Sequence, residues 1–201
     1  MSTLPKNYLT PEQYLEIERK AEFKSEYFPG EMFPTSGAPR AHNLIAWNAG
    51  ASLHQQLRGR PFEAYPGGMR VRVTAAGLYA YPDLVIVCAK PQFADGAFDT
   101  LLNPTVIIEV VSESTEAYDR GQKFAHYRSL ESLSEYLLIS SERISADLFA
   151  RKPDGNWRLD CRSRLEDSIE LKPVGCHLLL ADLYERVDFS LSPPFSREMV
   201  R

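Results

Sequence analysis

A strand, a helix and a second strand in the middle of the chain constrain the fold more than any other feature. The run Thr105–Val111 is short, β-branched and almost wholly apolar, which predicts a buried strand that ends near Ser112. A helix follows, with Ser114 or Thr115 as its N-cap, and the apolar run Tyr136–Ile139 predicts the second strand. This order favours an α/β fold in which helices flank a central mixed sheet.

Two acids lie in apolar surroundings where a carboxylate is costly to bury. Glu109 is in the middle of the first strand, and Asp83 opens a second apolar run, Pro82–Val87. If the two runs pair antiparallel with position numbers that sum to 192, Asp83 lies opposite Glu109, and their β-carbons are roughly 4.5–5.5 Å apart. The two carboxylates could then share one cation, and without one a carboxyl group would keep its proton. The helix places Asp119, Lys123 and Tyr127 on one stripe.

These residues also carry a resemblance to a known family. Pro82-Asp83 followed by Glu109-Val-Val111 resembles the PD-(D/E)XK pattern of the restriction-endonuclease superfamily. The longer run Asn103–Ile139 resembles the Uma family of restriction-endonuclease-like proteins, and the similarity extends over roughly residues 9–188 through SEYFPGEMFPTSGAPRAHNLI and RVRV…YPDLVIV. The resemblance implies a restriction-endonuclease-like core, with the β-rich segment after Leu138 as a C-terminal extension.

The chain departs from the superfamily pattern at one position that matters for mechanism. Val111 replaces the lysine expected two residues after Glu109, and the resemblance to the Uma family indicates Lys123, on the following helix, as its counterpart. It then implies that Asp83 and Glu109 bind a divalent metal and that Lys123 lies beside the attacking water and the scissile phosphate. Carboxylate ligands suit Mg²⁺ or Mn²⁺, which lower the pKa of a bound water and stabilise charge on a phosphoryl group.

Further residues are candidates with an ordinary explanation beside the functional one. The resemblance makes Glu26, Glu31 and His42 candidate neighbours of the metal, although a glutamate beside a turn is usually solvated and a single histidine is usually structural. Asp119 and Lys123 also form an i, i+4 pair, which stabilises any helix by about 0.3–0.5 kcal/mol. Both readings stay open for each of these residues.

Basic residues could form a path for phosphates. The alternating run Met69–Val73 points Arg70 and Arg72 to one face, where they contact phosphates or simply face water. Other surface-like basic positions are Arg120, Arg128, Lys90, Arg58 and Arg60. The loop Lys90–Asn103 has no regular period and could border a substrate cleft or form a disordered flap.

The remaining elements are marked by caps, turns and periodicity. They are an N-terminal helix with Thr10 as N-cap, Pro11 and Gln13, a type II turn at Phe28–Glu31, a helix over Ala41–Leu57, a hairpin of Ile144–Arg151 with Trp157–Arg162, a strand at Ile169–Leu171, and a short helix at Leu180–Tyr184. We expect one domain over residues 1–201, with an ordered core of about residues 9–188 and an unstructured tail over 189–201.

Composition limits the possible partners and compartments. The net charge of −4 gives no general attraction to a polyanion, so a nucleic-acid enzyme of this composition needs a local basic surface. Three cysteines without C-x-x-C spacing indicate neither a disulfide framework nor a zinc site, which favours a reducing compartment. Without an apolar stretch near 18 residues or a signal sequence, we expect a cytoplasmic protein with no membrane partner.

The sequence therefore predicts a metal-dependent endonuclease that uses Mg²⁺ or Mn²⁺ to hydrolyse phosphodiester bonds in nucleic acid, DNA in the first instance. A homodimer is expected if both strands of a duplex are cut. Two alternatives remain. One is a catalytically silent nucleic-acid-binding or assembly protein on the same fold, favoured by the net charge and the missing strand lysine; the other is a hydrolase of a smaller phosphoester.

Overall fold

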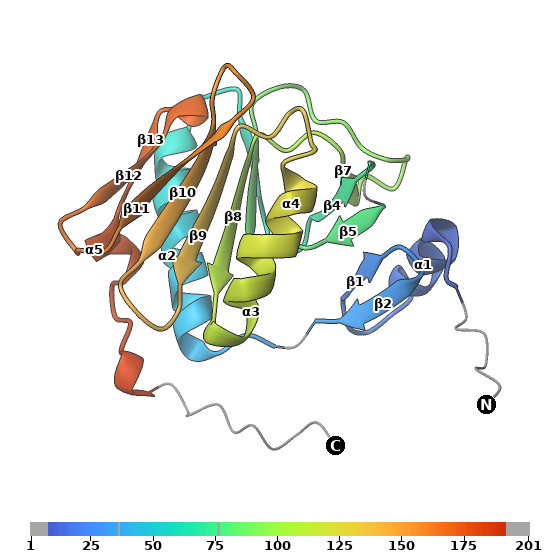
Figure 1. Cartoon of the computed structure of the whole chain (residues 1–201), viewed down its shortest axis with the longest axis horizontal. Helices are drawn as coiled ribbons and strands as arrows, with labels where there is room; N and C mark the ends of the chain where they lie inside the picture. The colour runs from blue at the N-terminus through green and yellow to red at the C-terminus, as the bar shows by residue number, and fades with distance from the viewer. Residues whose placement is uncertain (1–7, 36, 76, 192–201) are drawn as a thin grey trace.

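A six-stranded mixed sheet lies at the centre of the computed structural model, which describes residues 8–35, 37–75 and 77–191 (Figure 1). Its strands, in spatial order, are β11 (Trp157–Arg162), β10 (Ala146–Arg151), β9 (Glu135–Ser140), β8 (Val106–Val111), β6 (Leu84–Val87) and β3 (Glu63–Pro66). β8 and β9 are parallel, and the other neighbours are antiparallel. The predicted α/β fold with a central mixed sheet is confirmed.

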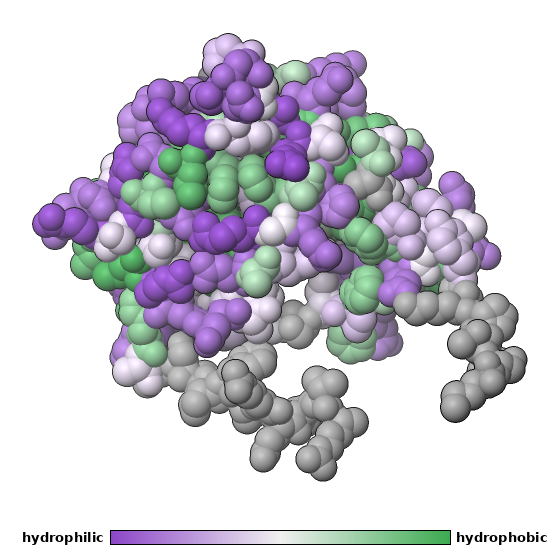
Figure 2. Space-filling view, in the orientation of Figure 1, coloured by the Kyte–Doolittle hydropathy of each residue, from purple (hydrophilic) through white to green (hydrophobic). Residues whose placement is uncertain are grey.

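Helices cover both faces of this sheet (Figure 1). On one face lies α2 (Arg40–Leu57), together with α5 (Leu180–Leu183) and the hairpin of β12 (Ser168–Leu171) and β13 (Cys176–Leu179). The other face carries α3 (Glu113–Tyr118), a π-helical turn, η1 (Asp119–Lys123), and α4 (Phe124–Tyr127). The surface on this side is largely hydrophilic, with smaller hydrophobic patches (Figure 2).

The alternation of side chains along β8 assigns its residues to two separate cores. Ile108 and Val110 pack on the side of α2, whereas Ile107 and Val111 pack on the side of α4. Because successive side chains of a strand point to opposite faces, Glu109 points to the side of α4. Both faces of the sheet are buried, which explains why every residue of this strand except Glu109 is apolar.

A second, five-stranded sheet packs beside α4 and carries the N-terminal part of the chain. Its order is β2 (Glu31–Pro34), β1 (Ser25–Phe28), β5 (Leu78–Ala80), β4 (Arg70–Val73) and β7 (Thr100–Leu101). Gly30 has φ +95° in the turn between β1 and β2, which fits the predicted type II turn. The helix α1 (Pro11–Glu18) begins with the predicted capping box, in which Thr10 and Gln13 bond each other reciprocally.

One prediction about local structure is wrong, and one of the two alternatives for the loop after β6 is excluded. Ser112, and not Ser114 or Thr115, is the N-cap of α3, because the Thr115 hydroxyl accepts a hydrogen bond from the Ser112 N–H. The loop after β6 is also not a free flap: it contains β7, and Arg19 on α1 binds Asp95 and Asp99 at 2.8 Å each.

The C-terminal region follows the prediction in outline. β10 and β11 form the expected hairpin, and α5 lies within the predicted short helix. The strand β13 was not predicted, and η3 (Phe189–Leu191) adds one turn of 3₁₀-helix at the start of the predicted tail. The rest of that tail, residues 192–201, lies outside the described residues, and the single domain stays a prediction.

Two further observations concern the state of the cysteines and the length and polarity of the helices. Cys88, Cys161 and Cys176 are free cysteines. In the ranges that the structure describes, no helix is long and apolar enough to span a bilayer.

Glu135 is a buried acid whose environment makes stability depend on pH. Its residue is 3% exposed, Oε1 accepts a hydrogen bond from the Lys172 N–H, and Oε2 has no hydrogen-bond partner. Burial raises the pKa of Glu135 from 4.5 to about 7. Between these two values the folded chain keeps the proton and the unfolded chain releases it, so rising pH favours unfolding until the folded carboxyl ionises near pH 7.

The substitution Glu135→Gln is therefore expected to stabilise the folded protein, relative to the wild type, more strongly as pH rises. The stability of the variant minus that of the wild type should increase by roughly 2 kcal/mol between pH 5 and pH 8, because glutamine cannot ionise. Urea unfolding at both values measures this difference. The exposed Glu131 supplies the control: Glu131→Gln should show no such change, and an equal change in both variants would contradict the prediction.

Candidate active site

Asp83 and Glu109 come together through the pairing of β6 with β8. The register pairs Leu84 with Ile108 and Val85 with Ile107, so the predicted position sum of 192 is confirmed for the strand residues. Extended by one residue, this register puts Asp83 opposite Glu109. Asp83 Oδ2 accepts a hydrogen bond of 2.7 Å from the Val110 N–H, which fixes the carboxylate against the next strand.

The second oxygen of Asp83 is bound by a histidine from α2. His42 Nε2 lies 2.9 Å from Asp83 Oδ1, and the two side chains are 18% and 21% exposed. The first turn of α2 thus reaches the start of β6, as the resemblance implied for His42. Among the acids and bases of this cluster, Asp83 and His42 are the most open to solvent, so a ligand has to approach from their side.

Glu109 is almost fully buried and faces a lysine. Glu109 Oε1 lies 2.9 Å from Lys123 Nζ and accepts a hydrogen bond of 3.2 Å from the Tyr127 hydroxyl. Burial raises the pKa of Glu109 well above its ordinary value, Lys123 opposes that rise, and the neighbouring acids Asp119 and Asp83 add to it. The site is therefore short of positive charge.

Lys123 is the centre of this cluster and joins three elements. Its ammonium lies 2.9 Å from Glu109 on β8, 3.0 Å from Glu26 on β1 and 3.4 Å from Asp119 in η1. Burial alone would lower the pKa of Lys123, but the acids, Glu109 foremost, raise that pKa well above its usual value. The lysine stays charged and holds the two sheets together.

The π-helical turn η1 carries both Asp119 and Lys123. The Phe124 N–H bonds the Asp119 carbonyl five residues back, and the Tyr136 hydroxyl donates to the same carbonyl at 3.2 Å. Asp119 and Lys123 are the two buried residues of the turn, whereas Arg120, Gly121 and Gln122 are not buried. Such turns are rare and frequently occur at functional sites, which fits the position of this one.

The residues fit a magnesium or manganese ion better than other metals. Three carboxyl groups, those of Glu109, Glu26 and Asp119, share the single ammonium of Lys123, and among the residues that the structure describes the carboxylate of Asp83 contacts only His42 and the Val110 N–H. A cation at Asp83 and Glu109 would therefore correct the charge. No group of three or more His, Cys, Asp or Glu side chains in the described part of the chain could enclose a metal ion. Mg²⁺ does not need such a group, because it keeps several waters and takes one or two carboxylates plus substrate phosphate.

The second-tier candidates fall in different places. Glu26 contacts the lysine, and its side chain is 16% exposed. Asp119 shares the same ammonium, and burial raises its pKa while Lys123 lowers it. Glu31 is half-buried at the start of β2, where it has interactions of its own, and it does not belong to the contacts of Lys123 and Asp83 described above.

The predicted phosphate contacts are occupied by other partners. Arg70 is buried and binds Asp99 at 2.9 Å, Thr100 at 3.0 Å and Tyr81 at 2.8 Å, so it anchors β4 to the loop and not a phosphate. Arg72 is half-buried over the ring of Tyr79, and its Nε has no hydrogen bond. The alternation of the strand predicts one face for both side chains, but Tyr14 of α1 and the segment of Asp99 and Thr100 cover Arg70.

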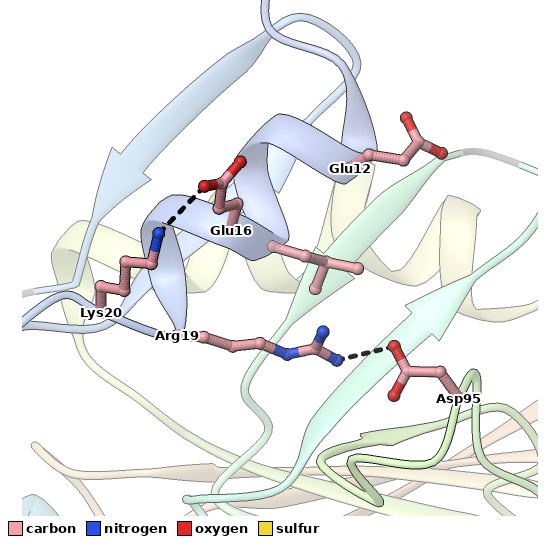
Figure 3. Close-up of a pocket in the computed structure, with 6 residues that line it drawn as sticks. Glu12, Glu16, Arg19, Lys20 and Asp95 are labelled. Atoms are coloured by element: carbon pink, nitrogen blue, oxygen red, sulfur yellow. Dashed lines mark hydrogen bonds and ion pairs between the residues drawn. The ribbon is translucent and has the colours of Figure 1, made fainter.

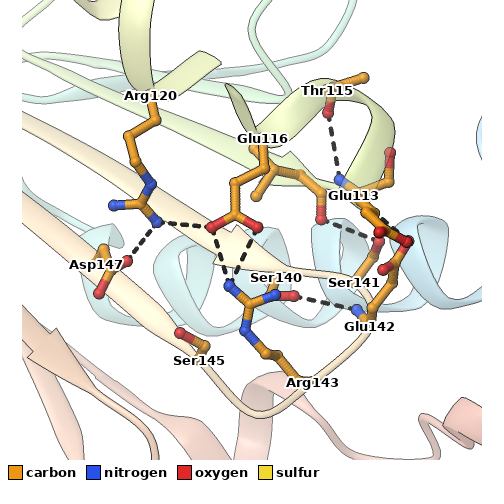
Figure 4. Close-up of polar contacts among 12 residues, drawn as sticks. Glu113, Thr115, Glu116, Arg120, Ser140, Ser141, Glu142, Arg143, Ser145 and Asp147 are labelled. Atoms are coloured by element: carbon orange, nitrogen blue, oxygen red, sulfur yellow. Dashed lines mark hydrogen bonds and ion pairs between the residues drawn. The ribbon is translucent and has the colours of Figure 1, made fainter. Parts of the chain in front are cut away.

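Arg120 belongs to a separate polar cluster at the end of β9 (Figure 4). Its Nη2 contacts Glu116 at 2.9 Å and Asp147 at 2.5 Å, and Arg143 binds Glu116 from the other side at 2.9 Å. These pairs join α3 to the hairpin of β9 and β10. The guanidinium of Arg120 is therefore engaged, and we do not propose it as a phosphate contact.

Sequence reasoning missed the polar role of two tyrosines. Tyr127 and Tyr136 are both fully buried aromatic residues of the core. Their hydroxyls nevertheless bond Glu109 and the Asp119 carbonyl. The position of Tyr127 on the stripe of Asp119 and Lys123 was the one signal that pointed to this contact.

A shallow pocket lies away from these acids, between α1 and the loop that follows β6 (Figure 3). Its lining includes Arg19, which points to Asp95, and Lys20, which pairs with Glu16 at 2.9 Å. Arg19 and Asp95, and Lys20 and Glu16, neutralise one another in pairs, so none of these four charges is free for a ligand.

Comparisons with known proteins confirm the family resemblance and the fold. The model of the Uma2 family, described as "Putative restriction endonuclease", matches residues 11–179. Two uncharacterized proteins of Synechocystis sp. are similar: sll1609 is 34% identical over 151 residues, or 75% of this chain and 85% of its own, and slr1290 is 32% identical over 181 residues, or 90% and 94%. A crystal structure of a "putative nuclease belonging to DUF820" from Anabaena variabilis covers 88% of this chain and 98% of its own with a TM-score of 0.73, and its 15% identity shows a shared fold.

Proposed function

Because this chain belongs to the Uma2 family of restriction-endonuclease-like proteins, we propose that it is a metal-dependent endonuclease that hydrolyses phosphodiester bonds in nucleic acid, DNA in the first instance. The observation that carries the proposal is the meeting of Asp83 and Glu109 on neighbouring strands, with the ammonium of Lys123 at 2.9 Å from Glu109. Acids and a lysine in this arrangement suit hydrolysis of a phosphodiester.

Each residue has a role that follows from its position. Asp83 and Glu109 would hold Mg²⁺ or Mn²⁺, which supplies a more acidic bound water and stabilises charge on the phosphoryl group. His42 and the Val110 N–H fix the two oxygens of Asp83, so the carboxylate is oriented before a ligand arrives. Lys123 stabilises negative charge that develops on the phosphate, because its ammonium is held in place and stays protonated.

The proposal predicts cleavage that depends on added metal. Purified protein should nick or cut plasmid, linear duplex or single-stranded DNA with Mg²⁺ or Mn²⁺, and EDTA should abolish cleavage. Gel electrophoresis measures both results, and RNA of the same sequence tests the preference for DNA. No cleavage of any nucleic acid with either metal, together with no Mn²⁺ binding in calorimetry, would contradict the proposal.

A second candidate is favoured by the burial of Lys123. Its ammonium is in contact with three acids, and its residue is 5% exposed, which also suits a protein that binds nucleic acid on this fold without cutting it. Such a protein would bind DNA in EDTA with an affinity that falls with salt, and would not cut it. The third possibility is hydrolysis of a smaller phosphoester. A chromogenic phosphodiester substrate tests it, because such an enzyme would hydrolyse this substrate and would not cut DNA. A homodimer and a cytoplasmic location stay predictions.

A further inference from the structure

The segment that contains α2 differs in charge from the rest of the chain. Residues 32–62 include no aspartate or glutamate, although the whole chain has 27 such residues in 201 and a stretch of this length would carry about four. The same segment contains Arg40, Arg58 and Arg60. This acid-free segment is the local excess of positive charge that a protein of net charge −4 needs for a polyanion.

The exposed face of α2 forms one continuous stripe. Residues at spacings of three and four share a face of a helix, and the buried stripe of Ile45, Ala49 and Leu53 packs on the central sheet. The exposed residues on the opposite side, which we call the α2 stripe, are Arg40, Asn43, Trp47, Ala51, His54 and Arg58. The stripe carries basic residues near both ends and an aromatic residue between them.

Trp47 is the second observation that points to a ligand. Its residue is 74% exposed, although a tryptophan is usually much more buried. Exposed aromatic side chains next to basic residues suit nucleic acids, because every base has a face on which an aromatic ring can stack. A second copy of the chain suits the stripe less well, since Trp47 is its single large apolar side chain and a stable dimer needs an apolar core.

The α2 stripe begins at the candidate active site. His42 in the first turn of the helix binds Asp83, so Arg40 lies at the end of α2 that is nearest to the acids. From there, the 18 residues of the helix extend about 27 Å along the surface. This length corresponds to about eight base pairs of duplex, with phosphates about 3.4 Å apart along each strand.

Acids beside the helix limit the path to one flank. Asn48 donates hydrogen bonds to the carbonyls of Leu183 and Glu185, so the segment after α5 lies along one side of α2. Asp182 and Glu185 are exposed there and would repel a phosphate. Arg60 is also engaged, because its guanidinium binds the carbonyls of Val174 and Gly175. Arg40 donates one longer hydrogen bond, of 3.3 Å from Nη2 to the Arg186 carbonyl, which a phosphate would have to replace or share.

We propose that the α2 stripe is the surface along which the nucleic acid lies beside the candidate active site. The inference rests on the proposed function for the identity of the ligand. Arg40 and Arg58 bind phosphates at the two ends of the stripe, and Trp47 contacts a base or sugar between them.

The first test follows the fluorescence of Trp47 in the presence of EDTA, where cleavage does not occur. A DNA of about 20 base pairs exceeds the length of the stripe, and a single strand of the same sequence offers unpaired bases. Either DNA should quench the emission of the wild type, and most of this quenching should disappear in Trp47→Phe. Trp157 is half-buried against Arg151 and remains as the constant background in both proteins.

The second test measures the affinity of the same DNA, labelled with fluorescein, by anisotropy. Arg40→Ala and Arg58→Ala should each raise Kd roughly five- to tenfold at 0.1 M salt and reduce the slope of log K against log salt by about 0.9. Trp47→Ala should raise Kd of the single strand about tenfold. The matched controls are the exposed residues Arg164 and Phe23, whose alanine variants should bind like the wild type.

The outcomes separate this inference from the proposed function. If the stripe variants and the control variants bind DNA with equal affinity and cut it at equal rates, and Trp47 emission does not change, the proposal for the α2 stripe is wrong. The proposed nuclease function would not be affected by that result. A dimer in sedimentation that Trp47→Ala dissociates would assign the stripe to a second copy instead. Absence of any binding and cleavage would overturn both proposals.

Discussion

Asp83→Asn is expected to lower nuclease activity by roughly 10²–10³-fold or more, because it removes one of two carboxylates from the proposed metal site. Asparagine has the shape of aspartate and keeps an oxygen that can accept the hydrogen bond from the Val110 N–H. The fold should therefore survive the change. The measurement is the rate of DNA cleavage at saturating Mg²⁺, together with Mn²⁺ affinity by calorimetry, which should also fall.

The control is Asp182→Asn, which changes an exposed acid on α5 and should leave both the rate and the affinity unchanged. Thermal unfolding of the two variants distinguishes lost chemistry from lost structure. Full activity of Asp83→Asn with a normal melting temperature would remove Asp83 from the mechanism.

Lys123→Met should destabilise the protein by about 3–5 kcal/mol at neutral pH, because it leaves buried carboxylates without their cation. The loss should shrink as pH falls. Burial already raises the pKa of Glu109 and of Asp119, so these groups take up protons readily once the ammonium is absent. Urea unfolding at pH 5 and pH 8 measures both effects, and Lys90→Met at an exposed position should stay within about 0.5 kcal/mol of the wild type.

A double variant tests whether the lysine acts through Glu109. Adding Glu109→Gln to Lys123→Met removes one of the unpaired acids, so the two changes should cost about 1–3 kcal/mol less together than the sum of the single changes. Additive effects would show that the contact of 2.9 Å contributes little. In either case the double variant should not cut DNA, since both polar groups of the proposed chemistry are gone.

The central part of the site could be predicted from the sequence because its residues belong to regular elements. The position sum of 192 for β6 and β8 is one natural pairing of two apolar runs, which the structure confirms, and the period of the helix puts Asp119, Lys123 and Tyr127 on one buried stripe. The capping box of α1 and the hairpin of β10 and β11 are local patterns of the same kind.

Contacts between the two sheets could not be predicted in this way. Nothing in the neighbourhood of Glu26 indicates that it meets Lys123, and nothing near Arg70 indicates that Asp99 and Tyr81 will bury it. Period and propensity describe single elements, whereas the contact of Glu26 depends on how one sheet packs on the other, and those of Arg70 depend on which strands pair with β4. For the same reason the sequence left open whether the loop after β6 is a flap, since its anchor Arg19 lies at the end of α1.

The ammonium of Lys123 also has a consequence for how the chain folds. It is bound by acids from β1, β8 and η1, so the N-terminal hairpin must reach the middle of the chain before the cluster exists. Contacts between residues so distant in sequence form late, after the entropy of closing long loops has been lost. We therefore expect that, during refolding, most secondary structure forms before nuclease activity returns. The recovery of activity would then report the last step of folding.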